Sequence, residues 1–431
     1  MSRDDLAWVR GDSSGLNIPA DIGALREGGE AFLTDAFRSG GALAVDNRVA
    51  RITQFEECPG GSTGRKLWLS VAYEKPAPGL HSDLFVKFSR DFDDPIRDRG
   101  KDQMDSEVRF AALSLTPDFP IAVPACLFAD YHCESGSGVL ITERIGFGKG
   151  AVERHYDKCL DDEMPAPLEH YQALIKAIAS LAGAHKAGRF AGVVAEQFPF
   201  DAAAAIGSDP IRYDARQLLN RVSRIGEFAA RYPRLVSEEL ATPGFLSDLR
   251  EQAPLFAEHQ RAIKRFLHAD PDLIALCHWN ANVDNAWFWR GAGGELSCGL
   301  MDWGRVGQMN VALALWGALS AAEPALLCDH LDGLLSLFVT EYRDHGGPIV
   351  EASTLGLHLN LFTATMGLAW LMDAPAMIEA RIPDLGAIQG RRDPRFSANE
   401  TARTQLHMMT NFLTLWRTRD FGADLGLLAL S

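Results

Sequence analysis

The stretch CHWNANVDN, residues 277–285, decides how this sequence is interpreted. It follows the apolar run PDLIAL and precedes AWFW, whose composition is typical of a strand. A buried strand here opens into a loop that holds one His, three Asn and one Asp within eight residues. His278, Asn280 and Asn285 have the spacing H-x-N-x-x-x-x-N. Such a concentration of polar side chains between two apolar strands indicates a loop with a chemical role.

The same spacing with Asp in place of Asn280 is the catalytic-loop pattern of kinase-like phosphotransferases, in which the Asp receives the proton of the substrate hydroxyl. In phosphoryl transfer the protein mainly positions and stabilises the reacting groups. It needs a cradle for phosphates, a cation beside them, metal ligands and a group that orients the attacking hydroxyl. The sequence contains a candidate for each of these parts.

Length and composition are those of a globular protein with two or three core-forming units. The 431 residues are 47% hydrophobic and 23% charged, and the formal net charge is −15. This charge argues against non-specific binding to nucleic acid or to anionic membranes, because both favour a basic surface. The N-terminus has no signal-peptide core, no apolar run could form an integral membrane segment, and the seven cysteines contain no C-x-x-C. We therefore expect a cytoplasmic protein.

Residues 41–145 have the pattern of a small β-rich unit. Hydrophobic residues alternate in KLWLSVAY and LFVKF, and two further strands are expected in AVPACLFADYH and SGVLITERI. A first strand, in ARITQFEE, is separated from KLWLSVAY by the glycine-rich CPGGSTG. The stretch DQMDSEVRFAALSL, which follows LFVKF, has the spacing of a helix.

After IGFGKG the pattern is mainly helical. Helices are expected over residues 168–188, 211–230, 235–268, 311–345, 353–380 and 398–418, with a short strand pair around 273–301. We predict an α+β, protein-kinase-like bilobal fold, with a small antiparallel β lobe carrying one helix and a larger, mainly helical lobe. The expected parts are an N-lobe over 1–143 with an N-terminal helical extension, a hinge over 144–150 and a C-lobe over 151–431. A ligand site is expected between the lobes.

The phosphate cradle is expected in the glycine turn, at Gly60, Gly61, Ser62 and Gly64. Glycines let backbone N–H groups approach phosphate oxygens closely. The turn also matches G-x-S-x-G, the nucleophile elbow of α/β-hydrolases, but that motif must lead into a helix, whereas KLWLSVAY alternates as a strand. It is not a Walker A loop either, since Arg65 stands where that motif requires glycine.

Lys87, in LFVKF, is the candidate cation beside the phosphates. It points away from the apolar face formed by Leu84 and Val86, and a buried ammonium group needs an anionic partner. Glu107, in the predicted helix, is the candidate partner. Taken singly, a solvent-facing strand Lys and a surface helix Glu would be the simpler interpretation of these two residues.

Asn285 and Asp302 are the candidate ligands for Mg²⁺. The stretch LSCGLMDWGRVG ends an apolar strand at Asp302, in a D-F-G pattern with Trp in place of Phe. Mg²⁺ prefers hard oxygen ligands, which an amide carbonyl and a carboxylate supply. An Asp at the end of a strand can equally cap a turn. The prediction therefore depends on the order of the parts: glycine turn, Lys strand, Glu helix, polar loop and D-W-G.

Residues 45–320 resemble the aminoglycoside/choline-kinase-like phosphotransferases, especially the ecdysteroid-kinase-like branch. LFVKF and SEVRFAAL look like the family's nucleotide-Lys strand and Glu helix, and VPACLFADY with GVLITERI resembles the strands before its hinge. IASLAGAHKAGRF is similar to its helix ending in L-A-x-x-H, where we interpret the His as a packing residue. The loop resembles H-G-D-x-W-x-N-N in form. By this resemblance, Lys87 contacts the phosphates of ATP or another NTP, Glu107 holds Lys87, and Asn285 with Asp302 holds Mg²⁺.

Three carboxylates of the family pattern are missing. Asn280 replaces the base, and Asn310 and Ala314 stand where the family has two Asp residues after D-W-G. Asn can accept a hydrogen bond from a hydroxyl but cannot take its proton. General-base catalysis contributes about 10²–10⁴-fold, and a loose transition state can tolerate its loss. Asp284 is a possible substitute in the same loop, so the catalytic candidates are Asn280, Asp284 and His278.

Three functions stay open on the sequence alone. The first is an ATP- and Mg²⁺-dependent phosphotransferase that acts on the hydroxyl of a small molecule, and we favour it because the phosphate and metal groups are retained. The second is a nucleotide-binding pseudokinase with a regulatory role, and the third is nucleotidyl transfer. The apolar helical C-terminal region favours a sterol- or lipid-like alcohol as the acceptor, although ordinary helix packing produces the same composition. The sequence does not indicate the oligomeric state.

Overall fold

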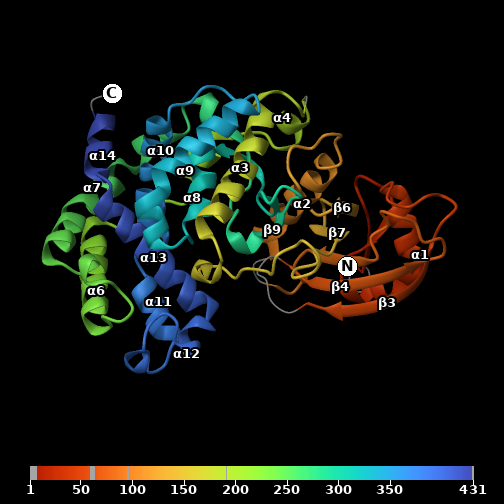
Figure 1. Ribbon diagram of the computed structural model, residues 1–431, viewed down its shortest axis with the longest axis horizontal. Helices are drawn as coiled ribbons and strands as arrows, with labels where there is room; N and C mark the ends of the chain where they lie inside the picture. The colour runs from red at the N-terminus through yellow and green to blue at the C-terminus, as the bar shows by residue number, and fades with distance from the viewer. Residues whose placement is uncertain (1–6, 59–63, 95–96, 191, 430–431) are drawn as a thin grey trace. The chain divides into compact units, whose positions relative to one another are not determined.

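The computed structural model describes residues 7–58, 64–94, 97–190 and 192–429 and divides the chain into two compact units (Figure 1). Unit 1 comprises Met1–Glu153, Phe190–Phe198 and Gly299–Gly307, and unit 2 comprises Arg154–Arg189, Pro199–Cys298 and Gln308–Ser431. The first division falls between residues 153 and 154, just after the segment 144–150 that was expected to be a hinge. Two later segments belong to unit 1 because they pack on its elements: Leu300, for example, donates a backbone hydrogen bond to Ala122. A linear division of the chain could not anticipate this return.

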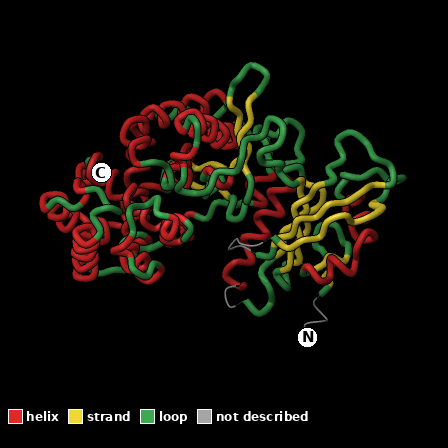
Figure 2. The backbone as a smooth tube through the Cα atoms, turned by 60° about the horizontal axis from the view of Figure 1, so that its bottom comes forward, coloured by secondary structure: helices red, strands yellow, loops and turns green. Residues whose placement is uncertain are grey.

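Unit 1 is built on a five-stranded antiparallel sheet with the strand order β3-β4-β5-β7-β6. Figure 2 shows these strands side by side. The elements of the unit are β1 (Trp8–Arg10), β2 (Asn17–Pro19), α1 (Ile22–Ser39), β3 (Val49–Glu57), β4 (Lys66–Tyr73), β5 (Asp83–Phe88), α2 (Arg97–Leu113), β6 (Cys126–His132), β7 (Ser137–Glu143) and α4 (Val193–Gln197).

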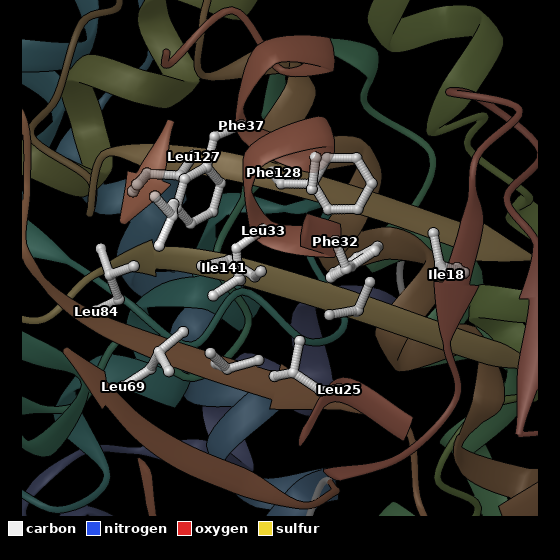
Figure 3. Packing of buried hydrophobic residues seen from close by; sticks show 14 of the residues in the cluster. Ile18, Leu25, Phe32, Leu33, Phe37, Leu69, Leu84, Leu127, Phe128 and Ile141 are labelled. Carbon is white, nitrogen blue, oxygen red and sulfur yellow. The ribbon is translucent and has the colours of Figure 1, made fainter. Parts of the chain in front are cut away.

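The two faces of this sheet have different partners. Residues of α1, including Phe32 and Phe37, pack with Leu84, Val139 and Ile141 in one buried cluster (Figure 3). The side chains that alternate with these belong to the opposite face, where Leu140 packs with Met104 and Val108 of α2. Lys87 pairs in register with Leu140, so it lies on the α2 face. The sheet therefore directs Lys87 toward the helix that carries Glu107.

Unit 2 is mainly helical. Its elements are α3 (Pro167–Lys186), α5 (Ala202–Gly207), α6 (Ala215–Arg231), α7 (Pro243–Leu267), β8 (Ile274–Cys277), β9 (Ala286–Arg290), β10 (Leu296–Leu300, whose end lies in unit 1), β11 (Gly307–Asn310), α8 (Val311–Leu319), α9 (Pro324–Asp344), α10 (Ala352–Trp370), α11 (Ala374–Arg381), α12 (Pro394–Ser397), α13 (Glu400–Thr418) and α14 (Phe421–Ala429). Short 3-10 helices cover Asp161–Glu163, Glu238–Leu240, Pro271–Leu273, Val283–Asn285 and Leu385–Ala387. β8 pairs with β11, and β9 pairs with β10. The predicted α+β class, with its small antiparallel β part and larger helical part, is confirmed.

Three predicted helix boundaries were wrong, and each is marked by a proline. The helix expected from 235 begins at Pro243, the one expected over 311–345 breaks before Pro324, and the one expected over 353–380 breaks before Ala374-Pro375. Proline has no backbone N–H and a fixed φ, so it suits the first turn of a helix and disrupts the interior.

Within the described residues, no single helix is long and apolar enough to cross a membrane. α10 and α11 satisfy a length and composition test only when they are taken together, and the pair is bent by 48°.

Candidate functional site

Lys87 lies between two carboxylates of unit 1. Its Nζ is 2.6 Å from Glu107 Oε2 and 2.6 Å from Asp302 Oδ1. Lys87 is 2% exposed and Glu107 is 5% exposed. Burial alone would lower the pKa of Lys87, but the carboxylates of Glu107 and Asp302 outweigh it and raise that pKa. The ammonium group is therefore charged at any physiological pH.

The D-W-G segment docks on α2 one turn beyond Glu107. Trp303 is buried and stacks on Phe110, with ring centroids 3.7 Å apart and planes inclined by 19°. Its Nε1 donates to Leu300 O at 3.0 Å. Because Glu107 and Phe110 are three residues apart, they lie on the same face of α2. The same helix face thus holds the Lys87 ion pair and fixes the residue next to Asp302.

Asp302 has a left-handed backbone, with φ of 61°. Only a few per cent of non-glycine residues adopt this conformation, and Asp and Asn do so most readily. Strained conformations of this kind persist where the surrounding packing enforces them, and they are concentrated at functional sites. Trp303, the next residue, is held by its stack on Phe110, and the Asp302 carboxylate contacts Lys87.

Of the glycine turn, Gly60, Gly61 and Ser62 lie outside the described residues. Gly64 has φ of +144°, and a Cβ atom on it would lie 1.9 Å from the backbone oxygen of Phe88. The glycine at 64 is thus required by the close approach of the turn to the end of β5. Whether the turn also binds phosphate stays a prediction.

The polar loop of unit 2 is held largely by contacts among its own residues. It follows β8, which is fully buried, as predicted for the apolar run before it. His278 is 2% exposed, and its Nδ1 accepts a hydrogen bond from Asn280 N at 3.0 Å. Asn285 Nδ2 donates to Asn280 O at 2.8 Å. His278 and Asn285 therefore fix the backbone on both sides of Asn280.

The side-chain oxygen of Asn280 already has partners in the loop. Asn282 Nδ2 donates to Asn280 Oδ1 at 2.5 Å, and Lys158 Nζ lies 3.5 Å from the same oxygen. By contrast, no described residue donates a hydrogen bond to Asn285 Oδ1. The amide of Asn285 is thus anchored through its nitrogen, while its oxygen is suited to ligate a hard cation.

Asp284 has a buried Oδ1 without a hydrogen-bond partner among the described residues. Burial raises the pKa of this carboxyl group, although the charge of Lys158 opposes the effect. The backbone oxygen of Asp284 accepts from His155 Nε2 at 3.0 Å. A buried carboxylate oxygen without a donor is costly, and it has a raised affinity for protons. Asp284 thus has a property expected of a general base.

Two residues near this loop were missed from the sequence, Lys158 and Asp161. Asp161 is fully buried, its Oδ2 accepts a hydrogen bond from the Tyr171 hydroxyl, and its Oδ1 has no partner among the described residues. Burial is the main cause that raises the pKa of Asp161 to about 7. The only sequence signal was the run of acidic residues in DKCLDDE, and such a run normally indicates a solvated surface.

His185, near the end of α3, accepts a hydrogen bond at Nδ1 from the backbone N of Leu276 in β8, at 3.1 Å. Burial lowers its pKa to about 4. A neutral histidine that supports the strand before the polar loop fits the expected packing role.

The candidate metal ligands belong to different units: Asp302 to unit 1, and Asn285 to unit 2. The described residues contain no cluster of three or more His, Cys, Asp or Glu side chains suited to a metal ion. Binding of one Mg²⁺ ion by Asn285 and Asp302 together stays a prediction.

No family model matches the chain, and no curated protein matches it. Among solved structures, the chain is similar to a choline kinase from Cryptosporidium parvum Iowa II, with 13% identity, 88% of this chain and 92% of that chain covered, and a TM-score of 0.45. It is also similar to a microcompartment-associated aminopropanol kinase, with 13% identity, 94% and 98% covered and a TM-score of 0.44. A third is the GDP complex of a mutant aminoglycoside 2'-phosphotransferase, with 13% identity, 87% and 95% covered and a TM-score of 0.40.

Proposed function

We propose that this chain is a nucleotide- and Mg²⁺-dependent phosphotransferase that acts on a hydroxyl group of a small molecule. The observation that carries the proposal is the arrangement of Lys87 between Glu107 and Asp302. One ammonium and two carboxylates leave a formal charge of −1 in a largely buried cluster. A purely structural ion pair needs only one of these acids. The second acid, Asp302, is about one-third exposed and is the one suited to a cation.

In this proposal Lys87 contacts the phosphates of ATP or another NTP, and Glu107 holds Lys87 in place. Asp302 and Asn285 are the residues that would hold Mg²⁺, which neutralises the charge that develops on the transferred phosphoryl group. The glycine turn, at Gly60, Gly61, Ser62 and Gly64, would cover the phosphates.

The acceptor chemistry is assigned to the polar loop. The hydroxyl oxygen attacks the γ-phosphorus while the bond to the bridging oxygen breaks, so that the nucleoside diphosphate leaves. The hydroxyl proton passes to Asp284, whose unpartnered Oδ1 and raised pKa favour proton acceptance. Asn280 orients the hydroxyl, and His278 keeps the loop in shape through its bond to Asn280 N.

One observation favours a pseudokinase as the second candidate. Asn280 Oδ1 is engaged by Asn282, and Lys158 lies beside it, so the position that holds the base in related patterns is both uncharged and occupied. A chain of this kind would bind nucleotide and Mg²⁺ without transfer and would serve a regulatory partner.

The deciding experiment measures ATP turnover with a panel of small alcohols, sterol- and lipid-like alcohols among them. Wild type is compared with Asn280→Asp, Asp284→Asn and Asp302→Asn. The phosphotransferase proposal expects turnover by wild type that falls strongly in Asp284→Asn and Asp302→Asn. If Asn280→Asp turns over ATP and wild type does not, the pseudokinase is favoured instead. The mass of the acceptor product separates a phosphate adduct from the nucleotide adduct that nucleotidyl transfer would give.

A further inference from the structure

Unit 2 contains a cavity of about 190 Å³ that involves none of the residues assigned above. It is lined by residues of α5, α7, β11, α8 and α10 and of the loops beside them. An engineered cavity of about 150 Å³ in another protein admits benzene. The present cavity is therefore large enough for a ligand of roughly ten non-hydrogen atoms.

Lys264, near the end of α7, is the first unusual feature of this cavity. It is 6% exposed, and its Nζ donates to the backbone oxygens of Ser208 and Asp209, the latter at 3.0 Å. No carboxylate in the described part of the chain lies within ion-pair distance of this ammonium group. Burial lowers the pKa of Lys264, and the charge of Asp209 opposes that effect only in part. An ammonium group has three N–H donors, so these two carbonyls leave one without an acceptor among the described residues.

His268 is the second unusual feature. Its Nδ1 is buried and has no hydrogen-bond partner among the described residues. Its ring centroid lies 5.9 Å from that of Phe200 and 5.9 Å from that of Phe362, which also line the cavity. Burial and the charge of Lys264 lower the pKa of His268 to about 4, so the ring is neutral at physiological pH. Lys264 and His268 thus line one cavity together with two phenylalanine rings and several smaller apolar and polar residues.

We propose that this cavity binds a small carboxylate with an apolar or aromatic body. One carboxylate oxygen would accept from Lys264 Nζ, and the other from the Nδ1–H tautomer of His268. The body of the ligand would lie against Phe200 and Phe362, with the thioethers Met309 and Met366 as adaptable contacts.

The charges around the cavity restrict the ligand further. Asp209 also lines the cavity, and its negative charge disfavours a dianion such as a phosphate ester. Ser208 is exposed and Asp209 is partly exposed, so this edge of the cavity is the side from which a ligand enters. A monocarboxylate with its charged end inward satisfies both polar groups, which otherwise cost free energy in a buried position.

The test uses benzoate as the probe and benzamide as its neutral counterpart of nearly equal shape. Binding to the full chain is measured by calorimetry, and the site is located by NMR of ¹³C-methyl-labelled methionines. The proposal expects saturable benzoate binding with shifts at Met309 and Met366, and no saturable binding of benzamide. Absence of saturable benzoate binding would overturn the proposal, and equal binding of benzamide would overturn it too, because the site would then not recognise a carboxylate.

Variants separate the ammonium group from non-specific effects. Lys264→Met keeps the side-chain length and removes the charge, and it is expected to weaken benzoate binding at least tenfold. If the Met variant does not fold, the neutral Lys264→Gln replaces it with the same weakening expected, and Lys264→Arg, which keeps the charge, should retain benzoate binding. The control is Lys176→Met on α3, where the lysine side chain is 53% exposed and pairs with Glu341 outside the cavity. Equal affinity in Lys264→Met and wild type would also overturn the proposal.

Discussion

Lys87 Nζ lies 2.6 Å from Asp302 Oδ1, although 215 positions separate the two residues in the chain. The contact brings the D-W-G segment back to the sheet of the first unit. Closing so long a loop costs conformational entropy, which the buried Trp303 stack offsets. The result is a carboxylate that is fixed in space by packing but still about one-third exposed. This combination is the basis of the first prediction.

Replacing Asp302 by Asn should abolish the stabilisation of the protein by Mg-ATP. Asn tolerates the left-handed backbone at this position, with φ of 61°, so the variant tests the charge rather than the fold. A ligand at one hundred times its Kd stabilises the folded state by about 2.7 kcal/mol. Thermal unfolding with and without Mg-ATP measures the effect. Asp105→Asn on α2, whose carboxylate pairs with Arg109, is the control and should retain the full shift.

Removing Lys87 alone should destabilise the protein more than removing Lys87 and Glu107 together. Lys87→Met leaves the buried Glu107 without its cation, and breaking a buried ion pair in this way costs about 3–5 kcal/mol. In Lys87→Met/Glu107→Leu the buried unpaired charge of Glu107 is gone, and the remaining carboxylate, Asp302, is about one-third exposed to water, so much of the stability should return. Urea unfolding of the two single variants and the double variant gives the coupling free energy. Strictly additive losses would contradict this account of the pair.

The strand Lys and helix Glu were visible in the sequence because alternation places Lys87 opposite an apolar face, and helical spacing places Glu107 in the next element. Sequence order alone could not establish their contact, since an exposed Lys and an exposed Glu give the same pattern. Two of the wrong helix boundaries, at Pro243 and Pro324, were predictable from the sequence. The expected helices ran through these prolines, although a proline favours the start of a new helix.

Other features could not have been predicted from the sequence. Asp161 lies in an acidic run, and its burial depends on tertiary packing around α3 and on the Tyr171 hydroxyl. Likewise, Lys158 reaches Asn280 across 122 positions of sequence. Neither residue has a motif or a periodicity that indicates its position. Polar residues that are buried by long-range contacts are the part of a site that a single sequence hides most completely.

Gly64→Ala should be much more damaging than the same substitution at another glycine with positive φ. A left-handed backbone costs a non-glycine residue about 1–2 kcal/mol, and this term applies to Gly79→Ala, where a Cβ meets nothing within 4 Å. At Gly64 the Cβ would also collide with the Phe88 oxygen, so the loss should exceed that of Gly79→Ala by about 2 kcal/mol or more. Because Phe88 follows Lys87, nucleotide affinity should fall in Gly64→Ala only. Similar stability losses in the two variants, measured by urea unfolding, would argue against the close approach.

Asp161→Asn should remove a pH dependence of stability. Burial raises the pKa of Asp161 to about 7 in the folded state, against 3.8 as its ordinary value. Between these two pH values the folded protein holds a proton that the unfolded chain has released. The free energy of unfolding therefore falls as pH rises from about 4 to about 7 and then stays level with respect to this group.

The measurement compares urea unfolding of wild type and Asp161→Asn at pH 5 and pH 8. Asn cannot ionise, so the variant should gain stability relative to wild type as pH rises. One pKa unit corresponds to about 1.4 kcal/mol, so this relative gain could approach about 4 kcal/mol over the full range. Any fixed cost of the amide beside Tyr171 lowers the free energy of unfolding equally at pH 5 and pH 8, so it leaves the pH dependence unaffected. The neighbouring Asp162, which is exposed and pairs with Arg392, is the control, and Asp162→Asn should keep the wild-type slope. Parallel pH profiles for wild type and Asp161→Asn would mean that Asp161 is ionised in the folded protein.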